Sequence, residues 1–311
     1  MNKALNRFHK SRGKLMSIEK NNNAICATGL SKRFGKVQAV SNIDLTVAPG
    51  EAVGLLGPNG AGKSTTLSML MGLQRPDAGQ TTIFGHPAGS VAARAICGAT
   101  PQSTDLPDQL SPREILSYTA MRYGTPLMID QLVSRFRLEK LIDRRVAGFS
   151  GGELRRVALA LAFVGDPKLV FLDEPTTGLD AASQEGFQET ARAYVAQGGA
   201  LILTSHHWDE IEAVCDTIAL IDHGQTVLTG RMDSMRARAN INRMTFGMPD
   251  GAVPPEWMQA HHDGQLWFLE TADSDAVLRR MVEDALPFQG LTLEPLKLKD
   301  LIDRIRQEET S

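Results

Sequence analysis

Short apolar runs alternate with segments of helical spacing over most of this chain. Residues 24–48 alternate apolar and polar positions between glycines, which predicts antiparallel strands leading into the main sheet. Ala52–Leu56 is typical of a buried strand, and Ser64–Leu73 has helical spacing. Further elements are predicted as helices at Gly152–Val164 and Ser183–Ala196, and as strands at Leu169–Leu172, Ala200–Thr204 and Ile218–Ile221. Strands that alternate with helices predict an α/β fold with a mixed or parallel sheet covered on both faces, and the first strands predict an antiparallel β subdomain beside it.

Two stretches depart from this pattern. Residues 103–147 hold no comparable buried strand, and their apolar spacing predicts a helical insertion at about 103–150. Near residue 231 the chain becomes charged, which indicates a linker helix at Arg231–Arg243. Strands are then predicted at Met244–Met248, Leu266–Leu269 and Leu291–Glu294, and helices at Ser274–Leu286 and Leu296–Gln307. We therefore expect a disordered basic tail (1–21), a main domain (22–230) and a small α+β accessory domain (231–311).

Charge and hydropathy narrow the functional classes. The 33 basic and 36 acidic residues give a net charge of −3, which argues against a nucleic-acid binder that works by bulk charge. The longest apolar run, Val157–Val164, is far shorter than the roughly 20 residues that span a bilayer. The three cysteines lie far apart without metal-ligand spacing, so they are expected to be reduced thiols.

A glycine-rich segment follows the first predicted buried strand and precedes a predicted helix. It fits the pattern G-x-x-x-x-G-K-[ST], whose amides and helix N-terminus cradle phosphate. Lys63 would supply a cation to the β- and γ-phosphates, and the Ser64 hydroxyl suits Mg²⁺. The candidate ATP-binding residues of this loop are Gly57, Pro58, Asn59, Gly60, Ala61, Gly62, Lys63, Ser64 and Thr65. The loop predicts a P-loop NTPase core, and by itself it leaves kinases, GTPases and ATPases open.

A pair of acids ends the predicted strand at Leu169–Leu172. Carboxylates at the carboxyl end of a buried strand are typical of a magnesium site at a sheet edge. Asp173 is expected to hold Mg²⁺, and Glu174, which projects differently, is expected to act as general base on the attacking water. Two acids can also be merely the solvated end of a strand.

Phe149-Ser150-Gly151-Gly152-Glu153 precedes this strand and resembles the L-S-G-G-Q signature of the ABC ATPase family. The resemblance implies that Ser150, Gly151 and Gly152 cap an ATP held by the opposite protomer of a dimer. Ser150 has a second reading as the cap of the following helix. Glu153 replaces the usual glutamine, which puts a possible negative charge near the nucleotide.

Other family elements occur in order over about residues 24–230. The resemblance implies that Gln102 contacts Mg²⁺ and the attacking water, that Gly178-Leu179-Asp180 joins the protomers, and that His206 donates to the γ-phosphate. Phe34 stands where the family usually has a tyrosine that stacks on adenine. These matches imply an active ATPase with ATP and Mg²⁺ as cofactors.

The resemblance also implies the partners. Two chains, most simply a homodimer, would enclose two ATP molecules, and a separate integral membrane permease would form the pore, which places the chain on the cytoplasmic side of the cell membrane. Ser205–Asp222 resembles the exporter branch typified by daunorubicin-resistance ATPases, which implies export of a drug, lipid or other amphipathic compound. The alternative is a soluble ABC ATPase without transport. A GTPase is disfavoured because the chain has no Asn-Lys-x-Asp motif.

Overall fold

The computed structural model describes residues 23–100, 105–123, 129–239, 241–249, 251–296 and 300. These residues form two compact units that divide between residues 228 and 229, with the short stretch Asp216–Ile218 grouped with the second unit. The basic tail expected over 1–21 lies outside the described residues. Among the helices that are described, none has both the length and the apolar character needed to cross a membrane.

The first unit begins with an antiparallel sheet. Its strand order is β2 (Val37–Val47), β1 (Ile25–Phe34), β4 (Ala78–Ile83) and β5 (His86–Pro87). Ile25 pairs with Val47 on one side and with Ile83 on the other. The antiparallel strands predicted at 24–48 are confirmed, and with β4 and β5 they form the separate antiparallel subdomain that was predicted. The sequence Ala-Gly-Gln-Thr-Thr-Ile of β4 carries little apolar alternation, so only its pairing with β1 defines it.

The main sheet has six strands. Their order is β10 (Gln225–Arg231), β9 (Thr217–Asp222), β3 (Ala52–Leu56), β8 (Ala200–Ser205), β7 (Leu169–Asp173) and β6 (Cys97–Ala99). Strands β3, β8, β7 and β6 run parallel to one another. Every residue of β3 and β8 is buried, as expected for strands covered on both faces. The register places Leu56 beside Ser205 and Asp173 beside Thr204, so the carboxyl ends of three strands meet at one edge.

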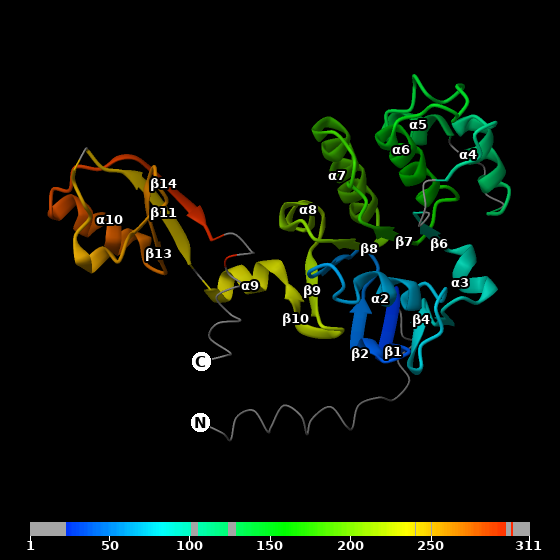
Figure 1. Ribbon diagram of the computed structural model, residues 1–311, viewed down its shortest axis with the longest axis horizontal. Coiled ribbons are helices and arrows are strands. Elements are labelled where there is room, and N and C mark those ends of the chain that lie inside the picture. The colour runs from blue at the N-terminus through cyan, green and yellow to red at the C-terminus, as the bar shows by residue number, and fades with distance from the viewer. Residues whose placement is uncertain are drawn as a thin grey trace. The chain divides into compact units, whose positions relative to one another are not determined.

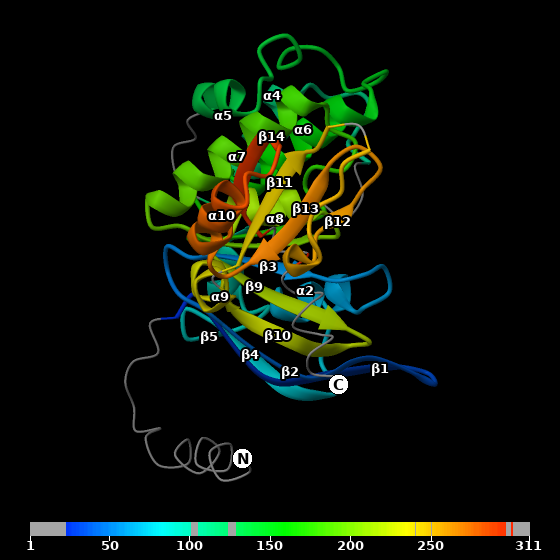
Figure 2. The same ribbon diagram turned by 90° about the vertical axis from the view of Figure 1, so that its left-hand side faces the viewer.

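Helices cover both faces of this sheet. Figures 1 and 2 show α2 (Lys63–Leu70) between the two sheets, and α6 (Gly151–Ala162), α7 (Ala181–Ala196) and α8 (Trp208–Val214) on the other face. Leu67, Met69 and Leu70 of α2 join a core cluster with residues of both sheets, such as Val40 and Phe171. The short helix α3 (Val91–Ala95) leads to β6. These elements confirm the predicted α/β class.

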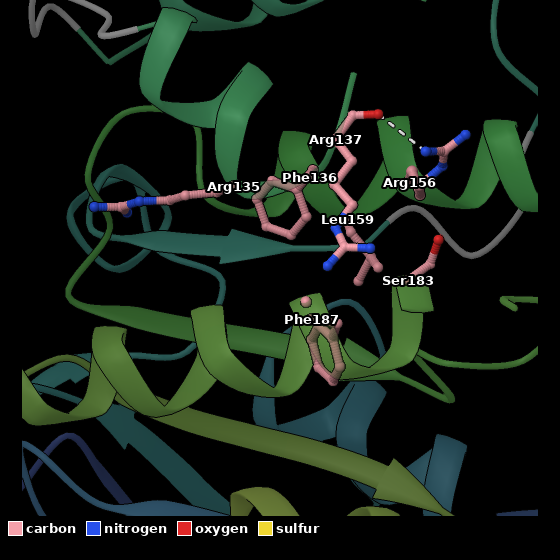
Figure 3. Close-up of a pocket in the computed structure, with 8 residues that line it drawn as sticks. Arg135, Phe136, Arg137, Arg156, Leu159, Ser183 and Phe187 are labelled. Atoms are coloured by element: carbon pink, nitrogen blue, oxygen red, sulfur yellow. Dashed lines mark hydrogen bonds between the residues drawn. The ribbon is translucent and has the colours of Figure 1, made fainter. Parts of the chain in front are cut away.

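The predicted helical insertion contains α4 (Pro112–Ala120) and α5 (Ile129–Arg135), and no strand among its described residues. It packs on α7 around a small pocket with only about 10 Å³ of open volume, shown in Figure 3. There Arg156 of α6 donates to the carbonyl of Arg137 at 2.9 Å, and the Arg137 Nε lies 3.4 Å from where a Cβ on Gly186 would stand. This side of α6 therefore fastens the insertion to the rest of the unit.

The second unit is a small α+β structure, as predicted. It contains α9 (Met232–Ala239), β11 (Asn242–Gly247), a 3₁₀ turn (Glu256–Met258), β12 (His261–His262), β13 (Trp267–Thr271), α10 (Ser274–Glu283) and β14 (Gln289–Pro295). The sheet order is β12-β13-β11-β14. Its core comprises Met244, Phe246, Met258, Leu269 and Met281.

Two boundary predictions in this unit need comment. The linker helix predicted at Arg231–Arg243 is too long: α9 ends at Ala239, and β11 begins at Asn242 because it pairs there with Thr271 and Pro295. These partners are distant in sequence, so the charged pattern alone extended the helix too far. The final helix predicted at Leu296–Gln307 lies almost wholly outside the described residues.

Candidate functional site

The glycine-rich loop joins β3 to α2 at the carboxyl edge of the main sheet. Gly57 and Gly62 have φ values of 154° and 101°, which side chains rarely adopt. A Cβ on Gly57 would stand 2.1 Å from the carbonyl oxygen of Ile221, and one on Gly62 would stand 2.4 Å from that of Ala39. Glycine is therefore required at both positions. No side chain caps the N-terminus of α2, so its amides are left to face an anion.

Lys63 begins α2 and is buried. Its Nζ donates to the carbonyl oxygens of Gly57 at 2.7 Å and Pro58 at 3.1 Å. These two hydrogen bonds of the ammonium group stabilise the bent conformation of the loop. A buried cation inside a ring of amides makes the loop strongly complementary to phosphate.

The loop opens into a solvent-accessible hollow of about 510 Å³. Glu174 lines the same hollow as Lys63 and Ser64, although it follows a different strand. Sequence reasoning missed Val37, Gln38 and Ala39 of β2, and His223 and Gly224 of the β9–β10 turn. All of these line the hollow too. They carry no local motif and reach the site only because two sheets meet there. The remaining lining residues are Asn59, Gly60, Gly62 and Thr65.

Asp173 and Ser64 converge from opposite sides of this edge. The Ser64 hydroxyl donates to Oδ1 of Asp173 at 3.2 Å, and the Thr204 hydroxyl donates to the same oxygen at 2.5 Å. The Asp173 backbone N–H donates to the Thr100 hydroxyl at 3.2 Å. A carboxylate and a hydroxyl that already touch form a hard-oxygen donor set that fits Mg²⁺. Thr204 holds the carboxylate of Asp173 and Thr100 holds its backbone, and neither threonine was predicted from the sequence.

Glu174 and His206 also meet, from the ends of β7 and β8. The Nδ1 atom of His206 lies 2.8 Å from Oε2 of Glu174. Glu174 has a φ of 48°, in the left-handed region, and its backbone N–H donates to the carbonyl and the hydroxyl of Thr204, both at 3.1 Å. This turn directs the carboxylates of consecutive residues to different partners, so that Asp173 meets Ser64 while Glu174 meets His206.

The signature-like segment begins α6 as a capping box. The Ser150 hydroxyl accepts from the Glu153 backbone N–H at 3.3 Å, and the Glu153 carboxylate accepts from the Ser150 N–H at 2.8 Å. This second bond is the main cause that lowers the pKa of Glu153. The replacement of glutamine by glutamate thus has a structural explanation, because either side chain completes the box.

The neighbouring residues of the signature and of the Asp180 turn lie close together. Gly151 is exposed, and a Cβ on Gly152 would stand 3.0 Å from the carbonyl oxygen of Gly178. Asp180 caps α7 by accepting from the Ser183 N–H at 2.7 Å, and hydrogen bonding by Ser183 lowers the pKa of this carboxyl. Ser150, Gly151, Gly152 and Asp180 do not occur among the described residues that line the phosphate-loop hollow. The predicted site residues therefore fall into two separate sets within one chain.

Two further predicted residues stand apart from both sets. Phe34 ends β1, is 49% exposed and has the Lys32 Nζ 5.7 Å from its ring centroid. It precedes the turn to Val37, which lines the hollow. Gln102 lies outside the described residues.

We expect Glu153→Gln to leave the melting temperature and ATP hydrolysis unchanged, because the amide oxygen still accepts from the Ser150 N–H. Glu153→Ala should lower the melting temperature at neutral pH. Since the folded pKa of Glu153 is depressed, this difference should be fully present above the ordinary glutamate pKa and should fade as pH falls through the lowered value. Thermal unfolding followed at several pH values checks this, and equal melting curves for Ala and Gln at neutral pH would contradict it.

Comparison with known proteins supports one family. A family model described as "ABC transporter" matches residues 40–177. The Nod factor export ATP-binding protein I of Rhizobium sp. (strain N33) is 36% identical over 301 residues, which cover 92% of this chain and 98% of the relative. The protein of the same name from Sinorhizobium fredii (strain NBRC 101917 / NGR234) is 38% identical, covering 86% of this chain and 82% of the relative.

Solved structures agree with this assignment. A structure described as the ATP binding subunit of an ABC transporter has a TM-score of 0.64 and 29% identity, covering 69% of this chain and 92% of the other. A dimeric ATP-binding cassette in a post-hydrolysis state, bound to ADP and Pi, has a TM-score of 0.61 at 21% identity, covering 67% and 98% of the two chains, and it supports the fold alone. With a relative that matches along almost its whole length, this chain belongs to the ABC transporter family, as an ATP-binding subunit that hydrolyses ATP.

Proposed function

We propose that this chain powers export of an amphipathic compound by hydrolysing Mg-ATP as one half of a dimer bound to a separate membrane permease. The observation that carries the catalytic part is the placement of Glu174 on the same hollow as Lys63 and Ser64. A phosphate-binding loop and a carboxylate on its open side form the minimum arrangement for hydrolysis of a bound nucleoside triphosphate.

The loop residues Gly57–Thr65 bind the phosphates. Backbone amides and the uncapped N-terminus of α2 donate to the β- and γ-phosphate oxygens. Lys63 turns its ammonium from the loop carbonyls toward the same oxygens. Phe34 offers an exposed ring on which adenine stacks.

Ser64 and Asp173 would hold Mg²⁺, together with Gln102. When bound, the ion neutralises charge that develops on the phosphate oxygens during transfer. The contact between the Ser64 hydroxyl and the Asp173 carboxylate supports this assignment. Thr204 and Thr100 keep Asp173 oriented by hydrogen bonds to its side chain and backbone.

Glu174 acts as general base. Its carboxylate accepts a proton from the attacking water, whose oxygen forms the new bond to the γ-phosphorus while the bond to ADP breaks. His206 lies 2.8 Å from this carboxylate and donates to the γ-phosphate when the nucleotide is bound. The two side chains hold each other in position before the substrate arrives.

The second set of residues would serve a partner chain. Ser150, Gly151 and Gly152 at the start of α6 and Asp180 at the start of α7 do not line the hollow among its described residues. A head-to-tail homodimer would bring them onto the ATP of the opposite protomer. Gly151, which is exposed, allows the close backbone approach that such an interface needs.

The names of the relatives support the export direction, since both are called Nod factor export ATP-binding proteins. We infer that the chain lies on the cytoplasmic side of the cell membrane, where it binds a permease that contains the pore. The resemblance to the daunorubicin-resistance branch stays a prediction, because the relatives reported above carry a different name.

Co-purification and stimulation test this proposal. The chain should co-purify in detergent with a multi-span membrane protein of its own cell, and ATP hydrolysis by the reconstituted complex should rise when cargo is added. Nod factor and daunorubicin are the two probes, with a soluble sugar as control. A chain that hydrolyses ATP but binds no membrane protein would overturn the transport proposal and indicate a non-transport ABC ATPase.

A further inference from the structure

Arg155 lies on α6, the helix capped by Ser150, and its guanidinium group reaches the turn that follows β7. Its Nη2 donates to the carbonyl oxygens of Asp173 and Glu174, both at 2.5 Å, and its Nε donates to that of Pro175 at 3.0 Å. One guanidinium group thus binds three consecutive carbonyls of the turn that follows β7. Lysine has one ammonium nitrogen, and it lacks the planar guanidinium group whose separate nitrogens can bond to several carbonyls at once.

The turn that Arg155 binds is the one that presents the proposed base. Glu174 has a φ of 48°, which a residue with a side chain adopts only where its surroundings enforce it. The Thr204 bonds to the Glu174 N–H hold one side of the turn, and the Arg155 bonds to the carbonyls hold the other. Without the arginine, the carbonyls of Asp173, Glu174 and Pro175 lose its bonds, the Glu174 carbonyl keeping only the Thr177 N–H at 3.3 Å, and the backbone is free to relax from the left-handed conformation.

The side chains around Arg155 stabilise its positive charge. Burial lowers its pKa, and the nearby charges of Asp173, Glu210 and Glu174 act in the opposite direction. An arginine remains protonated in such a place. Glu210 is itself buried and accepts from the Ser205 hydroxyl at 2.5 Å, and this hydroxyl accepts from the His207 N–H at 2.9 Å. The same charged cluster therefore borders both turns, the one that carries Glu174 and the one that carries His206.

We propose that Arg155 is a positioning residue for ATP hydrolysis, which holds the Asp173–Pro175 turn so that the Glu174 carboxylate faces the attacking water. This inference rests on the proposed role of Glu174 as base. Arg155 is not itself among the described residues that line the hollow, and its bonds go to backbone carbonyls of the turn that carries Glu174, not to the phosphate loop. Its loss should therefore slow the chemical step and spare ATP binding.

Steady-state kinetics of the purified full chain test this. Arg155→Met should lower kcat by about tenfold to a hundredfold, the range expected when a reacting group is misplaced by about an ångström. KM for ATP should stay within about twofold, because the binding loop is unaltered. Arg155→Lys should recover part of the rate. The matched control is Arg192→Met: Arg192 on α7 also donates to a backbone carbonyl, that of Ala213 at 2.5 Å, but far from the turn, so kcat should not change.

A second comparison separates positioning from general loss of structure. In a Glu174→Gln background, adding Arg155→Met should change the residual rate by less than about twofold, since no base remains to be positioned. The ATP-bound dimer of the double variant should form as readily as that of Glu174→Gln alone. A KM that rises with the fall in kcat, a loss of rate equally large in both backgrounds, or an unchanged kcat would each overturn the inference.

The result for Glu174→Gln alone keeps the two proposals distinguishable. Full hydrolysis by Glu174→Gln would overturn the proposed base, and the role of Arg155 with it. Loss of hydrolysis in Glu174→Gln combined with normal kcat in Arg155→Met would overturn only the role of Arg155. Should the methionine variant fail to fold, Arg155→Lys and Arg155→Gln replace it in the same measurements. The proposal then expects kcat to fall while KM for ATP stays the same.

Discussion

Glu174→Gln is expected to lower the rate of ATP hydrolysis by about a hundredfold or more, the usual contribution of a general base. Glutamine has the same shape, and its amide oxygen still accepts from His206, but it cannot take a proton from water at neutral pH. ATP affinity should be preserved, because Lys63 and the loop amides are unaltered. Phosphate release assays measure the rate, and titration with a fluorescent ATP analogue measures the affinity.

The same variant should accumulate as a dimer. If ATP joins two protomers and hydrolysis separates them, Glu174→Gln with Mg-ATP should elute as a dimer in size-exclusion chromatography, whereas it should elute as a monomer without nucleotide. Glu185→Gln is the matched control, since Glu185 is an exposed residue of α7 that undergoes the same change. Elution of Glu174→Gln as a monomer with Mg-ATP would contradict the shared site, and undiminished hydrolysis would show that another group is the base.

Lys63→Met should weaken ATP binding by about tenfold to a hundredfold, the equivalent of a lost charge-assisted hydrogen bond of about 1.5–3 kcal/mol. Lys63 is the buried cation of the loop, and methionine matches its length without its charge. The change also removes the bonds to the carbonyls of Gly57 and Pro58, so the loop loses a constraint on its shape. Equilibrium titration with ATP measures the effect.

Lys168→Met is the control for this prediction. Lys168 directly precedes β7, at the opposite end of the strand from Asp173, and its Nζ lies 6.0 Å from the ring centroid of Phe84. Its replacement should leave ATP affinity unchanged. Equal affinities for Lys63→Met and the unmodified protein would exclude the loop as the phosphate site, provided that the melting temperature shows the variant to be folded.

Those parts of the site that depend on neighbours in sequence were predictable. The loop Gly57–Thr65 follows a run of five apolar residues and precedes a helix, so both its conformation and its chemistry are encoded within one segment. The capping role of Ser150 was also expected, and the capping box with Glu153 is local for the same reason. By contrast, the replacement of the usual glutamine by Glu153 could be explained only from the structure, where the carboxylate accepts from the Ser150 N–H.

The errors in the fold have one cause. The strand β4 and the early start of β11 depend on hydrogen bonds to strands far away in the sequence, and their own residues carry weak alternation. Periodicity reports which face of a segment is apolar, but it does not report which partner covers that face.

The sequence by itself determined the α/β class, the phosphate loop, the pair of acids and the family resemblance, because each is a pattern within a single segment. Only the tertiary structure decided which groups surround them. It brought Ser64 to Asp173 and His206 to Glu174. It placed Thr204 and Arg155 around the turn after β7. It also left Ser150 and Asp180 outside the described lining of the hollow that contains Lys63. These contacts join segments separated by many residues, and they form because parallel strands bring their carboxyl ends to one edge of the sheet.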